Sequence, residues 1–143
     1  MNNAQENLDI KIRFLEMIQA IMTRMASNSF MLKGWAITLV AGVFALSAKD
    51  SKGIFFLIAY VPVVLFWFLD SYYLQLERQY KHLYDISTDL PPDKIDFKIK
   101  RPNPCREQKT YYDQCLFSRT EIWFYLPTAL LITAVIILSL YIG

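Results

Sequence analysis

The most informative absence in this sequence is that of charge from three long segments. These segments run from Gly34 to Ala48, from Ile54 to Leu69 and from Ile122 to Ile142. Each is about as long as a helix that crosses the hydrocarbon core of a bilayer. We therefore expect an integral membrane protein. Ion-coupled pumps usually carry ionisable groups within the membrane, so the charge-free segments argue against an active transporter.

The chain also has little of what enzymes and metal sites need. It contains one histidine, His82, and four glycines, none of which falls in a phosphate-binding motif. A four-ligand zinc site within one protomer is poorly supported, and no nucleophile and base form a recognisable set. We expect no enzyme activity, no metal and no cofactor. In a reducing compartment, Cys105 and Cys115 are expected to remain ordinary thiols.

Basic residues are distributed unevenly around the three apolar segments. Thirteen of the 15 Lys and Arg residues lie either before the first segment or between the second and the third, and only Lys49 and Lys52 lie in the turn KDSKG. The positive-inside rule places the more basic side in the cytoplasm. We predict three membrane spans, with a cytoplasmic N-terminus and a C-terminus on the opposite face.

The predicted fold is an all-α membrane protein with four regions. Residues 1–33 form an amphipathic cytoplasmic helix, residues 34–69 a transmembrane hairpin, residues 70–121 a cytoplasmic helix and loop, and residues 122–143 a third transmembrane helix. The first helix has too little positive charge for a typical headgroup-binding helix, which favours packing against the other cytoplasmic helices. It either breaks near Asn28 or continues into the first span.

The region after the second span is expected to begin as a helix, because residues 70–85 contain no glycine or proline. Pro91 and Pro92 end this helix. Residues 94–100 then alternate between apolar and charged side chains, and this period of two predicts a short β-strand. A single strand is unstable, so it needs a partner from another chain or lies as an extended segment on the helices. A helix resumes near Glu107 and continues into the third span.

The cytoplasmic end of the second span is the first candidate site. Asp70, Glu77 and Tyr84 share one helical face at seven-residue steps, and Arg78 and Lys81 flank that face. One interpretation is a helix stabilised by ordinary ion pairs, with Glu77 and Lys81 at a favourable spacing. The alternative is a site that couples the cytoplasmic part to the spans.

A face of small residues on the first span is the second candidate site. It comprises Thr38, Ala41, Gly42, Ala45 and Ala48. Small side chains let helices approach closely in lipid. This face either packs against the second span within the hairpin or mediates contact between copies of the chain.

A group of basic residues is the third candidate site. It comprises Lys98, Lys100, Arg101 and Arg106. The group either belongs to a solvated loop or contacts anionic headgroups, a nucleotide or an acidic partner. The net charge of the chain is only +2, and no nucleic-acid partner is expected.

The stretch LDSYYLQLERQYKHLYD, together with the N-terminal helix and the close hairpin, resembles the SLATT-type effectors. These are small two-span proteins found beside bacterial nucleotide-signalling and other phage-defence modules. The resemblance covers about residues 8–88, and the third span departs from the pattern. It implies a homo-oligomeric effector that contacts membrane lipids and perturbs the membrane when a cytoplasmic sensor is triggered. The competing expectation is a non-toxic adaptor that recruits a partner through residues 85–121.

Overall fold

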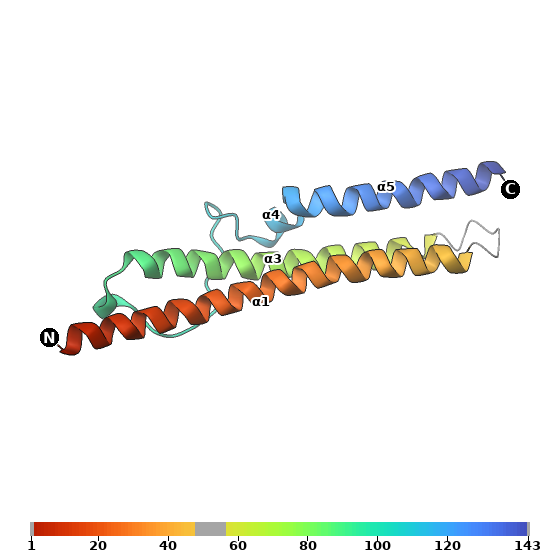
Figure 1. The fold of residues 1–143 in the computed structure, drawn as a ribbon. Helices are drawn as coiled ribbons and strands as arrows, with labels where there is room; N and C mark the ends of the chain where they lie inside the picture. Colours follow the sequence, from red (N-terminus) through yellow and green to blue (C-terminus); the bar gives the residue numbers. More distant parts are fainter. Residues whose placement is uncertain (1, 48–56, 143) are drawn as a thin grey trace.

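The computed structural model describes residues 2–47 and 57–142, and within these ranges its regular structure is helical (Figure 1). Helix α1 spans Asn2–Ser47, α3 spans Tyr60–Asp89, α4 spans Tyr112–Leu116 and α5 spans Arg119–Ile142, with a short 3-10 helix, η1, at Pro92–Lys94. Helices α1 and α3 lie side by side and antiparallel, and α5 runs along the half of the molecule that contains the end of α1. The predicted helical class is confirmed.

Helix α1 is continuous over 46 residues and passes through Asn28 without a break. No proline or glycine precedes Gly34, so nothing in the sequence interrupts the backbone hydrogen bonds before the first apolar segment. At 1.5 Å per residue, α1 is about 69 Å long, more than twice the thickness of a bilayer core of about 30 Å. A large part of α1 therefore extends beyond a single membrane crossing.

Two helices of the described chain are long and apolar enough to cross a membrane. One is α1, over Gln5–Ser47, and the other is α5, over Arg119–Tyr141. The second span predicted from the sequence is not among these helices. Helix α3 begins at Tyr60, so its apolar part before Asp70 is about 15 Å long, half of a bilayer core. Residues 48–56, which include the predicted turn, lie outside the described residues.

The predicted β-strand at residues 94–100 is wrong. Residues 95–100 have no regular structure, and no strand occurs in the described chain. Ile95 is instead buried against α1, and the ring of Phe97 meets that of Phe14 edge-to-face at 5.6 Å between centroids. Because a lone strand has no ladder to join, its apolar side chains pack on the helices. This is the extended-segment alternative.

Helix α3 ends where the two prolines require. Its C-cap, Leu90, has an extended backbone with ψ of 142°, as expected of a residue that precedes proline. The Lys11 ammonium donates hydrogen bonds to the carbonyls of Thr88 at 2.9 Å and Leu90 at 2.7 Å. A cation at this position satisfies carbonyls left free at the helix end. The contact also ties the beginning of α1 to the end of α3.

The helix predicted to run from Glu107 into the last span is interrupted. Residues 106–109 form turns, α4 is only five residues long, and a break at residues 117–118 separates it from α5. The indole N–H of Trp67 donates to the carbonyl of Leu116 at 3.0 Å. Because this bond fixes α4 against α3, the chain must change direction before α5 begins.

Two apolar clusters hold the helices together. Phe14 and Ile18 of α1 are buried against residues of α3, which agrees with the packing interpretation of the N-terminal helix. That cluster also contains Ile95, Tyr80, Leu83, Tyr84 and Leu90. The other cluster lies among α1, α3 and α5, and its buried members are Ala36, Val40, Ala59, Val63, Tyr125 and Ile132. Buried polar side chains occupy the level between the two clusters.

Candidate functional site

Three ionisable side chains from three helices meet between the apolar clusters. They are Lys33 of α1, Asp70 of α3 and Glu121 of α5, and we call them the junction cluster. The Lys33 ammonium donates to Oδ2 of Asp70 and, at 3.2 Å, to Oε1 of Glu121. Both carboxylate side chains are fully buried, whereas that of Lys33 is 15% exposed. The junction cluster therefore connects α5 to both helices of the hairpin.

Two neutral side chains complete the shell around the junction cluster. Lys33 donates a third hydrogen bond to Oγ of Ser29 at 3.1 Å, and the Tyr125 hydroxyl donates to Oδ2 of Asp70 at 3.1 Å. The Lys33 ammonium also lies 5.8 Å from the centroid of the Phe124 ring. An ammonium has three protons to donate, so Lys33 uses all of them within the protein. Such complete bonding is what buried charges require.

The junction cluster is not electrically balanced. It brings two carboxyl groups to one ammonium. In addition, Asp70 Oδ1 and Glu121 Oε2 are buried without a hydrogen-bond partner in the described chain. Buried polar atoms that lack a partner are uncommon in folded proteins. These two oxygens are therefore the least satisfied polar atoms of the junction cluster.

The predicted junction residues are divided between two places. Asp70 belongs to the junction cluster, whereas Glu77, Lys81 and Tyr84 line an open hollow of about 420 Å³ between α1 and α3. The predicted ion pair between Glu77 and Lys81 is not among the ion pairs of the described chain. Burial raises the pKa of the Glu77 carboxyl, and the nearby charges of Arg78 and Lys81 oppose that rise.

Arg78 faces a different part of the protein from Glu77. Its guanidinium donates to the carbonyl of Lys109 at 3.0 Å and to Sγ of Cys115 at 3.7 Å. Cys115 is fully buried, and burial raises the pKa of its thiol. Cys105 is partly exposed, and both cysteines are free thiols. Arg78 therefore anchors the segment before α4 and does not belong to the site of Asp70.

One member of the predicted basic group bonds to α3. The Arg101 guanidinium turns toward α3 and donates to Oε1 of Gln79 at 2.9 Å and to Oε1 of Gln75 at 3.3 Å. These bonds hold the extended segment against α3. The other basic residues of the group are exposed and have no shared ligand-binding geometry: Lys98, Lys100 and Arg106.

The small-residue face of α1 does not pack within the hairpin. Its described members are all exposed: Thr38, Ala41, Gly42 and Ala45. Ala36 and Val40 are the buried positions of this part of α1. A Cβ atom built on Gly42 meets nothing within 4 Å, so there is open space beside the helix. Hairpin packing therefore does not explain these positions; Ala48 lies outside the described residues.

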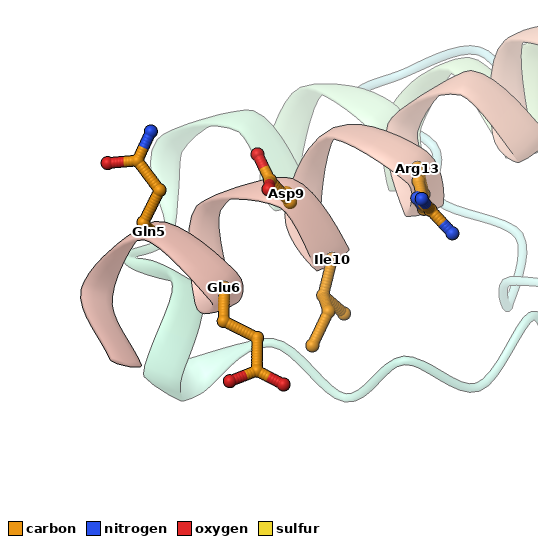
Figure 2. Close-up of a pocket in the computed structure, with 5 residues that line it drawn as sticks. All are labelled: Gln5, Glu6, Asp9, Ile10 and Arg13. Carbon is orange, nitrogen blue, oxygen red and sulfur yellow. The ribbon is translucent and has the colours of Figure 1, made fainter. Parts of the chain in front are cut away.

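Two further hollows have different characters. An apolar groove of about 310 Å³ lies between α3 and α5, with Trp67 and Leu126 among its lining residues. A shallow hollow of about 460 Å³ lies at the N-terminal end of α1 (Figure 2). The side chains in Figure 2 point in different directions and do not converge. The second hollow therefore offers no recognisable binding chemistry; it is lined by Gln5, Glu6, Asp9, Ile10 and Arg13.

Sequence reasoning identified Asp70 but missed Lys33, Glu121 and Tyr125. A signal for the charged residues is present, because each borders an apolar segment. Lys33 directly precedes the first segment, Asp70 directly follows the second, and Glu121 directly precedes the third. If the three apolar segments run antiparallel to one another in sequence order, the ends that carry Lys33, Asp70 and Glu121 lie on the same side of the membrane.

No family model matches the chain, and comparisons with curated proteins and with solved structures give no match. The functional argument therefore rests on the residues and their geometry.

Proposed function

We propose that this protein is a three-span bacterial inner-membrane effector that self-associates through α1 and, as an oligomer, permeabilises or depolarises the membrane. The observation that carries the proposal is the exposed small-residue face at Thr38, Ala41, Gly42 and Ala45. Burial of apolar surface gives little drive for association in lipid, so close approach of backbones at small residues becomes important. The spacing includes two pairs four residues apart, which lie one above the other on a helix.

The proposed topology adds residues 54–69 as a second span between α1 and α5. The charge distribution then places the N-terminus, the distal part of α3 and the loop before α5 in the cytoplasm. In this arrangement Lys33, Asp70 and Glu121 lie at the cytoplasmic boundary of the membrane, just outside the apolar segments. At such a boundary, charged side chains are far less costly than at the bilayer centre.

The continuity of the helices supports a role for the cytoplasmic part as a trigger. Helices α1 and α3 run without interruption from the distal apolar cluster to the junction cluster. A partner that displaces the distal part would therefore move the membrane part as well. The resemblance of residues 8–88 to SLATT-type effectors suggests that the partner is a phage-defence sensor.

Association through the small-residue face is tested with matched substitutions in the full-length protein. Ala45→Leu and Gly42→Leu fill the open space beside α1 and are expected to reduce crosslinked oligomers in membranes at least several-fold. Ala134→Leu makes the same change at an exposed position of α5 and is expected to leave the oligomers intact. A monomeric wild-type protein, or equal loss in all three variants, would show that the face is not the interface.

The membrane activity is tested by induced expression with a potential-sensitive dye. The wild-type protein is expected to depolarise the cells, either alone or together with the sensor encoded beside it. Ala45→Leu is expected to lose this activity at an equal protein level, whereas Ala134→Leu retains it. Normal growth and potential with the wild-type protein under both conditions would contradict the proposal.

An adaptor role is the second candidate, and one observation favours it. Within residues 85–121, the side chains of Phe97, Ile99 and Tyr111 remain 36–42% exposed. A cytoplasmic partner that binds this segment would cover them. In that case purification of the full-length protein in mild detergent yields a second protein at fixed stoichiometry, and Phe97→Asp abolishes its recovery. Recovery of a pure homo-oligomer would count against the adaptor.

A further inference from the structure

The hydrogen bonds of the junction cluster leave a defined place for one more proton. Lys33 donates to Ser29, Asp70 and Glu121, and Tyr125 donates to Asp70, so Lys33 and Tyr125 have no further proton to donate. Asp70 Oδ1 and Glu121 Oε2 remain without donors although both side chains are fully buried. Both carboxyl groups accept a hydrogen bond from the same Lys33 ammonium. A proton on either oxygen takes the place of the missing donor.

The net charge of the junction cluster also favours one bound proton. With both carboxylates ionised, the junction cluster carries one excess negative charge on two side chains that are fully buried. Two carboxylates that share a buried site rarely ionise together, because each disfavours the charge on the other. One bound proton makes the net charge of the cluster zero and leaves the ion pair with Lys33 intact.

The charged and titratable groups around the junction cluster on α3, α4 and α5 do not neutralise its excess negative charge. The nearest charges from other levels of α3 are Glu77, which is acidic, and Arg78, which is bonded near α4. From α4 the nearest titratable group is the thiol of Cys115. Helix α5 adds only the hydroxyl of Tyr125, and in the described chain no second cation contacts either buried carboxylate.

We infer that the junction cluster is a binding site for a single proton at neutral pH, held on Glu121, whose carboxyl group accepts fewer hydrogen bonds than that of Asp70. The proton comes from bulk water and forms a carboxylic acid O–H on Glu121. Release of the proton returns it to water and leaves two like charges between α3 and α5. This inference does not depend on whether the protein permeabilises membranes.

Infrared spectroscopy of the full-length protein in phosphatidylcholine nanodiscs tests the inference. A protonated carboxyl group has a C=O stretch that is separate from the amide bands and shifts when the solvent is exchanged for D₂O. At pH 7 the wild-type protein is expected to show this band with an intensity of about one group per chain. Fewer than about one in a hundred free Glu carboxyl groups is protonated at this pH. Absence of the band above about pH 6 would overturn the inference.

Substitutions assign the band to the junction cluster. Asp70→Asn and Glu121→Gln each leave one carboxylate to pair with Lys33, and both are expected to abolish the band at pH 7. Lys33→Met is expected to increase it about twofold, because both carboxyl groups then become neutral. Asp96→Asn, at an exposed site, leaves it unchanged. If Glu77→Gln alone removes the band, the proton belongs to Glu77 and the inference is wrong. The helical amide band checks folding in each variant.

Discussion

Replacing Lys33 with methionine gives the sharpest test of the junction cluster. The substitution keeps an apolar stem of similar length but removes the only cation of the described chain that contacts the two fully buried carboxyl groups. Each carboxyl group must then be neutral. Protonating a carboxylate whose ordinary pKa is about 4 costs about 4 kcal/mol at pH 7. Because one proton is already bound in our scheme, Lys33→Met requires one more and is expected to lower the free energy of unfolding by about 4 kcal/mol. Removing one partner of a buried ion pair typically costs about 3–5 kcal/mol.

The loss should depend on pH in a defined direction. The folded variant binds one proton more than the folded wild-type protein, so acid favours the variant. The difference in unfolding free energy should therefore shrink by about 1.4 kcal/mol for each unit by which the pH is lowered toward 4. Reversible unfolding in mixed micelles, followed by the fluorescence of the three tryptophans, measures both quantities.

Two control variants separate the lost charge from other effects of the substitution. Lys100→Met makes the same change at an exposed position and should alter stability by less than about 0.5 kcal/mol. The triple variant Lys33→Met, Asp70→Asn, Glu121→Gln removes all three charges and should recover most of the lost stability. If Lys33→Met alone lies within about 1 kcal/mol of the wild-type protein at pH 7, the carboxylates do not depend on Lys33 and the reasoning fails.

Three further predictions concern the residues between the second and third apolar segments. Burial raises the pKa of folded Glu77 above its ordinary value of 4.5, so Glu77→Gln should increase the free energy of unfolding at pH 7. This gain should disappear below pH 4.5, where the Glu77 carboxyl group is protonated in both the folded and the unfolded protein. An equal gain at pH 7 and below pH 4.5 would contradict the prediction. Arg101→Ala removes the bond to Gln79 and should speed proteolysis of the segment at residues 95–110 roughly tenfold, from a loss of about 1.5 kcal/mol. Maleimide should label Cys105 at least about tenfold faster than buried Cys115, and equal rates would disprove the burial.

Local features of the sequence predicted the long helices well. Pro91 and Pro92 determine the end of α3, because neither can continue the helical hydrogen bonds. The course of α1 through Asn28 was left open, since asparagine is tolerated inside a helix and also favours its start. The alternation at residues 94–100 correctly suggested extended backbone. Whether such a segment pairs as a strand depends on neighbours that are distant in the sequence.

The junction cluster was only partly predictable for the same reason. The end of an apolar segment marks Asp70, but helical periodicity predicts partners for it only among nearby residues of the same helix. Its actual partners, Lys33 of α1 and Tyr125 of α5, come from two other helices. Their meeting depends on how α5 is aligned with the hairpin, and that alignment follows from the turn after α4. Single-helix patterns contain no information about it.

The position of Lys33 along α1 has a mechanical consequence. About 46 Å of uninterrupted helix lies on its N-terminal side and about 21 Å on its C-terminal side. The ammonium is held at this point by both other long helices, so a tilt of α1 pivots there and moves its two ends in opposite directions. With arms in a ratio of about two to one, a weak push at the far N-terminal end becomes a shorter but about twofold stronger push on the segment that bears Gly42 and Ala45.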